Sequence, residues 1–250
     1  MVRPFRGPGT VAMTPTTPPA LPVGDPVPDW RPVSPPPRSP IAGAYVRLEP
    51  LDPDAHAGAL LDAFKTDEAG LGWTYLPYGP FRDEGAFRNW ISESCLGDDP
   101  LFFTILDEGG SPAGLAAYLR IDPARGSIEV GHIHYALRLR RTRAATEAMY
   151  LLMRRAFDEL GYRRYEWKCD ALNAASRSAA ERLGFTFEGI FRQHVVYKGR
   201  NRDTAWYSII DREWPAVRAA YEAWLAPQNF DDIGRQRTAL DARSALSPEA

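Results

Sequence analysis

Cysteine is scarce in this chain, with only Cys95 and Cys169 among 250 residues. Small secreted domains held by disulfides use many more, so both are expected to be free thiols in a cytoplasmic protein. The four histidines and two cysteines show no metal-ligand spacing, so no metal site is expected. No apolar run approaches the roughly 20 residues of a membrane helix, and no apolar region follows Arg3 and Arg6, so neither a membrane span nor a secretory signal is expected.

A charge excess of either sign is also missing. The formal net charge is -2, and without a global basic field a nucleic-acid partner is not expected. Lysine occurs only at Lys65, Lys168 and Lys198, so nearly all positive charge is arginine. Hydrophobic residues make up 44% of the chain, enough for one sizeable core. Composition leaves the oligomeric state open, a homodimer included.

Proline, by contrast, is concentrated at one end. Residues 1–40 hold 13 of the 23 prolines, which remove backbone donors and fix φ. This predicts a largely disordered arm over residues 1–40, within which residues 1–24 should be dispensable. A folded domain is expected over residues 41–226, followed by a polar, loosely held tail over residues 227–250.

Hydrophobic periodicity and turn residues predict seven strands and five helices. The strands are expected at 44–51, 101–106, 113–121, 127–137, 164–169, 187–197 and 204–210, and the helices at 53–66, 82–95, 142–160, 174–183 and 214–225. Hairpins dominate the first half, and one βαβ crossover surrounds the long helix. The order predicts an α/β fold of the α+β kind, with a mixed, mainly antiparallel seven-stranded sheet flanked by helices.

The most informative segment is the strand over 127–137, which runs through an arginine-rich loop into the long helix. The first turn of that helix offers unpaired N–H groups and a positive dipole end, which suit a phosphate. Arg140, Arg141 and Arg143 add charge, and Thr142 and Thr146 add hydroxyls. The alternative is an ordinary loop with solvated arginines and Thr142 as a simple N-cap.

The run Arg140–Ala145 resembles motif A of the GNAT N-acetyltransferase superfamily, whose pattern is Gln/Arg-x-x-Gly-x-Gly/Ala. Arg140 matches the first position and Ala145 the last, whereas Arg143 replaces the central glycine. Downstream, Asn173–Ser176 and Leu183–Gly189 resemble the Asn-x-x-Ser and Leu-Gly-Phe-x-x-Glu-Gly signatures of the ribosomal-protein N-terminal acetyltransferase branch, the Rim type.

The resemblance implies transfer of an acetyl group from acetyl-CoA to a primary amine, either a peptide N-terminal amine or a small amine. It also implies that the strands holding Tyr135 and Trp167 splay apart to admit the pantetheine arm. The residues implied to bind the cofactor are Ile133, Tyr135, Arg140, Thr142, Arg143, Ala144, Ala145, Thr146 and Asn173.

For catalysis, Glu129 fits the strand position where many relatives place a carboxylate, and we expect it to act as general base. Many relatives use a tyrosine four residues before the Gly-Phe pair as proton donor. That position is Ala180 here, so Ser176 is the expected substitute, assisting the leaving thiolate. His194 and Asp203 are the alternative bases.

Two alternatives remain open at this point. The lost glycine and the absent tyrosine are compatible with a catalytically silent GNAT-fold protein that binds CoA or a protein partner. The loop 73–81 is dense in aromatic residues and proline; it forms either a wall of the acceptor pocket or a small satellite core. His134 and Glu129 should face opposite sides of their strand unless a bulge intervenes.

Overall fold

The computed structural model describes residues 21–244, so the predicted disorder of residues 1–20 lies outside the described residues. The chain divides into two units, Met1–Arg31 and Pro32–Ala250. In the described part of the first unit, residues 21–29 are exposed, and Trp30 N–H donates to Val27 C=O. The second unit holds all the helices and strands of the described residues.

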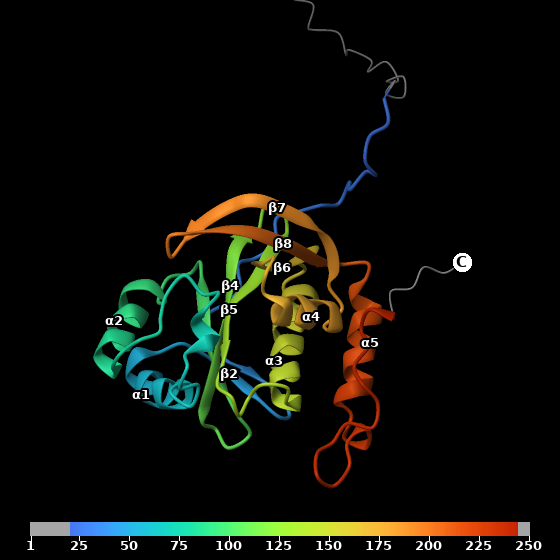
Figure 1. Ribbon diagram of the computed structural model, residues 1–250. Helices are drawn as coiled ribbons and strands as arrows, with labels where there is room; N and C mark the ends of the chain where they lie inside the picture. The colour runs from blue at the N-terminus through green and yellow to red at the C-terminus, as the bar shows by residue number, and fades with distance from the viewer. Residues whose placement is uncertain (1–20, 245–250) are drawn as a thin grey trace, which may run out of the picture. The chain divides into compact units, whose positions relative to one another are not determined.

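One sheet organises the second unit, in the order β1-β2-β3-β4-β5-β6-β8-β7 (Figure 1). Every neighbouring pair is antiparallel except β5 and β6. The predicted fold class is confirmed, but the sheet has eight strands rather than seven, because the two-residue β1 pairs with β2. The strands are β1 (Ile41–Ala42), β2 (Arg47–Pro50), β3 (Leu101–Leu106), β4 (Pro112–Asp122), β5 (Ser127–Tyr135), β6 (Arg164–Asp170), β7 (Thr186–Tyr197) and β8 (Arg200–Ile210).

Helices cover the sheet on both faces, and their predicted positions are confirmed to within a few residues except at the end of the long helix. They are α1 (Pro53–Phe64), α2 (Glu84–Ser94), α3 (Arg143–Arg154), α4 (Ala174–Arg182) and α5 (Trp214–Leu225), with short turns η1 (Leu71–Trp73), η2 (Arg155–Glu159) and η3 (Pro227–Asn229). The predicted long helix thus ends in a π-helical turn, η2. No helix within residues 21–244 is long and apolar enough to cross a membrane.

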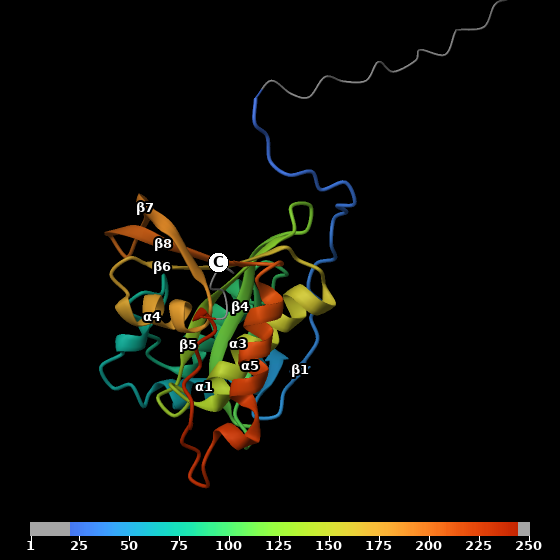
Figure 2. The same cartoon turned by 90° about the vertical axis from the view of Figure 1, so that its right-hand side faces the viewer.

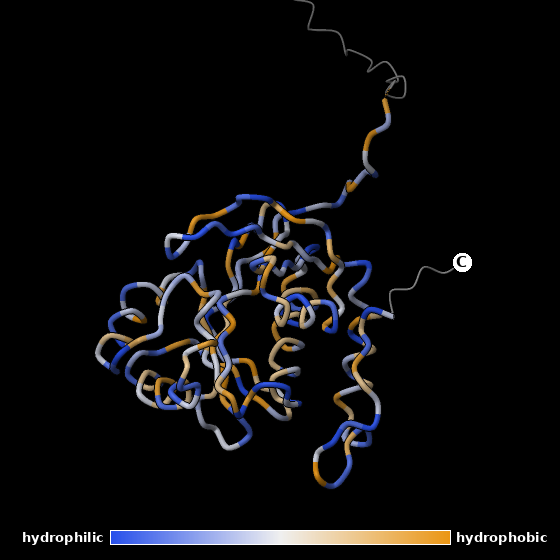
Figure 3. The backbone as a smooth tube through the Cα atoms, viewed as in Figure 1, coloured by the Kyte–Doolittle hydropathy of each residue, from blue (hydrophilic) through white to orange (hydrophobic). Residues whose placement is uncertain are grey.

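Two hydrophobic clusters define the two faces. The smaller cluster lies under α1 and α2, which we call the α1–α2 face of the sheet. The larger cluster lies under α3, α4 and α5, which we call the α3–α5 face. Figure 2 shows α5 alongside α3 on that face. Beyond α1 and α2, the α1–α2 face continues over β5, β6 and the β7–β8 hairpin, where Figure 3 shows long hydrophilic stretches.

Both ends of the second unit pack on the folded domain, and only the packing of the C-terminal end departs from expectation. Arg155 donates to the carbonyls of Ser39 and Pro40, so the end of the predicted arm packs on the domain. In the segment after Pro227, expected to be loosely held, Leu240 and Ala242 join the main core. The hydrophobic residues of this segment are too widely spaced to form a periodic pattern, so the sequence did not indicate this packing.

Candidate active site

A gap opens between β5 and β6, as predicted. The two strands pair from Ser127 opposite Arg164 to Val130 opposite Trp167. Beyond that point β5 stays bonded to β4 and β6 to β8. Beyond Val130 and Trp167, each strand is therefore held by its outer neighbour, and β5 and β6 are not paired with each other.

The backbone of Ile133 and Tyr135 faces this gap. Ala136 N–H donates to Ala113 C=O on the β4 side. Because backbone groups alternate in direction along a strand, those of Tyr135 and Ile133 point the other way, toward β6. The Tyr135 carbonyl accepts from Arg140 Nε at 3.0 Å. The gap is therefore lined by hydrogen-bonding groups that no neighbouring strand uses.

At one end of the gap, α3 presents the first turn of its backbone. Thr142 is the N-cap, and its Oγ1 accepts from Ala145 N–H at 3.1 Å. The N–H groups of Arg143 and Ala144 find no acceptor among residues 21–244. Thr146 Oγ1 bonds the Thr142 carbonyl. Two donors at a positive helix end are therefore left for an anion.

The loop arginines do different things. Arg140 donates to Asp67 at 3.1 Å and ties the loop to the residues after α1. The Arg143 guanidinium lies 3.6 Å from the centre of the Tyr45 ring and 4.3 Å from that of Phe230. This cation–π stack holds the side chain that replaces the motif glycine in one orientation.

The other border of the gap is the start of α4. Asn173 Oδ1 caps the helix by accepting from Ser176 N–H at 3.1 Å. Ser176 Oγ accepts from Trp167 Nε1 at 3.0 Å. Since an indole can only donate, the hydroxyl hydrogen of Ser176 points away from Trp167. Burial raises the pKa of the neighbouring Cys169 thiol, and a hydrogen bond donated by the Ser176 hydroxyl opposes that rise.

A bulge in β5 changes which side chains share a face. His132 has a φ of 51°, and the β4–β5 register slips between Leu115 and Ala117. The extra residue reverses the alternation, so Glu129 and His134 both lie on the α1–α2 face. His134 stacks on Trp73 at 3.8 Å between ring centres.

The two histidines are packed and neutral. Tyr78 Oη and His132 Nδ1 are 3.0 Å apart, within hydrogen-bond distance. Burial lowers the pKa of His132 and of His134 to about 4. Among residues 21–244 no group of three potential ligands could hold a metal ion.

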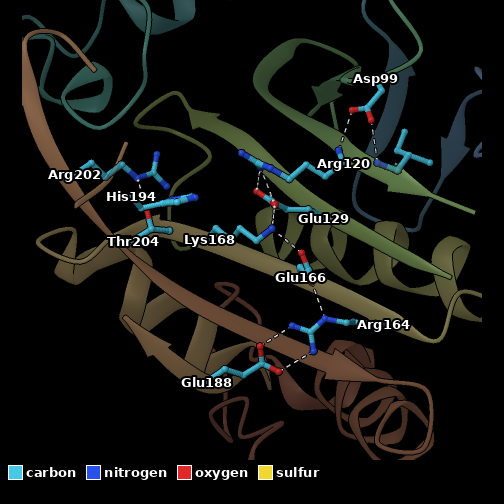
Figure 4. A network of polar contacts seen from close by, with 11 residues as sticks. Asp99, Arg120, Glu129, Arg164, Glu166, Lys168, Glu188, His194, Arg202 and Thr204 are labelled. Atoms are coloured by element: carbon cyan, nitrogen blue, oxygen red, sulfur yellow. Dashed lines mark hydrogen bonds and ion pairs between the residues drawn. The ribbon is translucent and has the colours of Figure 1, made fainter. Parts of the chain in front are cut away.

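Glu129 is the most deeply buried carboxylate at the gap. Its side chain is 4% exposed, and both its oxygens accept from Arg120 at 2.8 Å. Lys168 Nζ, equally buried, lies 2.8 Å from Oε2 (Figure 4). Burial raises the pKa of the Glu129 carboxyl, and the ion pairs with Lys168 and Arg120 oppose that rise.

The ion pairs continue along β6. Lys168 also contacts Glu166 at 2.7 Å, Glu166 accepts from Arg164 at 2.7 Å, and Arg164 pairs with Glu188 of β7. Lys168 and Arg120 were not expected from the sequence as neighbours of Glu129. The strand over 164–169 carries a charge at every second residue, namely Arg164, Glu166 and Lys168. Alternate residues of a strand share a face, so this pattern could have placed Lys168 in a row of charges.

The alternative bases lie on the β7–β8 hairpin. His194 Nδ1 contacts Thr204 Oγ1 at 3.0 Å. Asp203 instead accepts from Gln193 N–H at 2.8 Å, and this bond lowers the pKa of its carboxyl. Asp203 therefore fixes a bulge in β7. Beside it lies an open cavity of about 620 Å³, lined by Phe191, Arg192, Gln193 and His194.

The aromatic loop 73–81 closes over the same side. Trp73 belongs to the smaller core and Tyr78 packs against it, in line with the satellite-core alternative for these two residues. Tyr75 Oη donates to the Leu172 carbonyl at 3.2 Å, and Lys198 Nζ donates to the Trp73 carbonyl at 2.9 Å. The hairpin tip, the loop and the segment before α4 are thereby joined around the gap.

Comparison with known proteins gives a consistent result. The family model described as an acetyltransferase (GNAT) domain matches residues 46–186. A Bacillus subtilis protein named as a ribosomal N-acetyltransferase, YdaF, is 30% identical over 105 residues, which span 42% of this chain and 57% of that protein.

Two solved structures resemble the chain over most of its length. A GCN5-related N-acetyltransferase from Brucella melitensis is 50% identical, with a TM-score of 0.84, and the match covers 86% of this chain and 99% of that one. A GNAT-family structure from Chromobacterium violaceum ATCC 12472 is 44% identical, with a TM-score of 0.72, covering 80% and 100%.

Proposed function

Because the chain belongs to the GNAT family of acetyltransferases, enzymes that use acetyl-coenzyme A as the acetyl donor, we propose that it acetylates a primary amine. The acceptor is the α-amine of a peptide or the amine of a small molecule. The observation behind this proposal is the gap between β5 and β6, which joins the two faces of the sheet beside a buried carboxylate.

The residues around the gap fit the cofactor in chemistry. Backbone groups of Ile133 and Tyr135 face the gap and suit the amides of the pantetheine arm, and the first-turn N–H groups of α3 suit the pyrophosphate. Arg140 holds the loop in place through Asp67. The full set proposed to form this site is Ile133, Tyr135, Arg140, Thr142, Arg143, Ala144, Ala145, Thr146 and Asn173.

The two proposed catalytic side chains lie on opposite faces of the sheet. Ser176 contacts Trp167, whose ring packs in the larger core under α3, α4 and α5. Glu129 lies on the other face, since Trp167 and Lys168 alternate along β6 and Lys168 pairs with Glu129. The thioester thus enters from the α3–α5 face, and the amine approaches from the α1–α2 face.

Glu129 has the chemistry of a general base. Amines with the pKa of lysine are mostly protonated at neutral pH, and only the neutral amine attacks a thioester. Arg120 and Lys168 occupy three of the roughly four acceptor positions of the carboxylate. One position on Oε1 is left for the amine proton, and the two cations favour the ionised form that a base requires.

The bond changes then follow. The amine nitrogen bonds to the acetyl carbon, the carbon–sulfur bond breaks, and the amine proton passes to Glu129. The Ser176 hydroxyl, oriented by Trp167, turns from the Cys169 thiol and donates to the cofactor sulfur as that sulfur acquires negative charge. A hydrogen bond to a charged group is stronger than a neutral one, so it favours thiolate departure.

The test is Glu129→Gln, with Glu166→Gln as its matched control. Both carboxylates contact Lys168, at 2.8 and 2.7 Å, and face each other in the paired part of β5 and β6, but burial raises the pKa of Glu129 whereas hydrogen bonds from Lys168 and Arg164 lower that of Glu166. Glu129→Gln should lower kcat by about 10²-fold, the scale expected for a lost base. In the wild type, kcat/KM should fall as acid protonates a base with a pKa raised above the ordinary glutamate value. That limb should flatten in Glu129→Gln.

Glu166→Gln should retain kcat and the acidic limb. If the two variants behave alike, or if Glu129→Gln keeps its acidic limb, Glu129 is not the base. Binding of acetyl-CoA by calorimetry and the melting temperature verify that each variant is folded.

A further inference from the structure

We propose that the acceptor carries a carboxylate close to its reactive amine, and that Arg192, Arg202 and His194 bind this carboxylate. The inference rests on the proposed amine acetylation and specifies its acceptor class. It starts from the charge of the β7–β8 hairpin, which arches over the α1–α2 face of the sheet (Figure 1).

The distal half of this hairpin is strongly positive. Between Phe191 and Thr204 it holds four arginine or lysine residues and one acid, Asp203. The Asp203 carboxylate already accepts hydrogen bonds from Gln193 N–H and from Asn201 Nδ2. The chain as a whole has a slight negative excess, so this positive charge is gathered locally rather than a general property.

Several hydrogen-bond donors lie in the cavity lining or beside it without an acceptor among the described residues; His194 belongs to the lining, and Arg202 does not. Arg202 Nε donates to the buried Thr204 hydroxyl at 3.1 Å, and His194 Nδ1 contacts the same oxygen at 3.0 Å. The terminal nitrogens of Arg202 and the Nε2 of His194 then have no hydrogen-bond partner among residues 21–244. Arg192 lines the same cavity. A guanidinium fork matches a carboxylate in geometry as well as charge.

A chain of side-chain contacts links the cavity to the proposed base. Phe191 lines it and stacks on Trp206 with ring centres 4.4 Å apart. Lys168 Nζ lies 3.7 Å from the centre of the same Trp206 ring and pairs with Glu129. Figure 4 shows His194 and Arg202 on the same side of the sheet as Glu129. Phe191, Trp206 and Lys168 therefore connect the carboxylate site to Glu129.

These features favour one class of amine over others. A polyamine would bring further positive charge against Arg192 and Arg202, which costs binding energy. The cavity volume of about 620 Å³ falls in the range of roughly 300–1,000 Å³ typical of small-ligand sites. An amino acid or the first residues of an acidic peptide fits both the volume and the charge.

The experiment compares acceptors that differ only in charge. Three amidated tripeptides with the same first and third residues carry glutamate, glutamine or lysine at the second position, and free glutamate is compared with free glutamine. The glutamate member of a set should have the lowest KM, and added salt should raise that KM, because screening weakens ion pairs. If glutamate is preferred only among the peptides, the acceptor is a peptide. If glutamate is preferred only among the free amino acids, the acceptor is a small molecule.

The double variant Arg192→Gln/Arg202→Gln is compared with Arg212→Gln, an exposed arginine outside this hairpin. The double variant should raise the KM of the acidic acceptor by about 10-fold, as expected for two partly exposed ion pairs, with the KM of acetyl-CoA and of the neutral acceptor unchanged. Arg212→Gln should change none of these constants.

Equal KM values across the charge series, or a preference for lysine, would overturn the carboxylate site while leaving amine acetylation intact. An equal rise in KM for acidic and neutral acceptors in the double variant would also overturn it. Absence of turnover with every amine would instead refute the proposed function itself, and the inference with it.

Discussion

The backbone conformation of a single residue, His132, determines which side chains of β5 share a face at the gap. Its φ of 51° inserts an extra residue into β5, and the face of every later residue is exchanged. The sequence allowed a bulge but could not locate it, because few non-glycine residues adopt positive φ and nothing in the sequence marks His132 as one that does. Glu129 itself was found from its strand position, whereas its partners Arg120 and Lys168 come from other strands.

His134 gives a prediction at this scale. Burial lowers its pKa to about 4, below the ordinary value of about 6.5. Between these values the unfolded chain binds a proton that the folded chain does not, so stability is full above about pH 6.5 and falls as the pH drops toward 4. His134→Phe keeps a ring against Trp73 and removes this titration. Between pH 7 and pH 5 it should lose about 2 kcal/mol less stability than the wild type.

Denaturant unfolding at the two pH values measures the difference directly. The same loss in both proteins would mean that His134 does not contribute to acid sensitivity. The comparison is internal to each protein, so a general change in stability from the substitution does not affect it.

Among the helices and strands, those with regular sequence patterns were predicted. Segments held by contacts with residues far away along the chain were missed. The capped helix α1, with Asp52 before Pro53, and the strand over 101–106 follow from local signals. The Arg143 stack does not, because its two rings come from Tyr45 and Phe230, far away along the chain on either side. The C-terminal segment was misjudged for the same reason.

Truncation tests that segment. A chain ending at Asn229 loses Phe230 from the Arg143 stack and Leu240 and Ala242 from the core. Since losing a buried leucine costs a few kcal/mol, the melting temperature should fall by about 5 °C or more, and affinity for acetyl-CoA should weaken. A chain starting at Asp25 should keep both. Equal melting temperatures for the two truncated chains would contradict this account of the C-terminal segment.

Over the whole molecule, element order was enough to predict the fold class, because few topologies accommodate hairpins followed by one crossover. Net charge was less informative. A value of -2 conceals a basic hairpin and a row of ion pairs on one sheet face. Such separation of charge depends on which residues come together in the fold, so composition alone could not predict the charge of the proposed acceptor site.

The central claim is that this chain transfers an acetyl group to an amine across the gap between β5 and β6. The most direct measurement is thiol release from acetyl-CoA by the purified chain with a panel of primary amines, together with mass spectrometry of the amine. The account predicts release that depends on the amine, with one acetyl group gained per thiol released. Binding of acetyl-CoA without amine-dependent release, across acidic, neutral and basic amines alike, would contradict it.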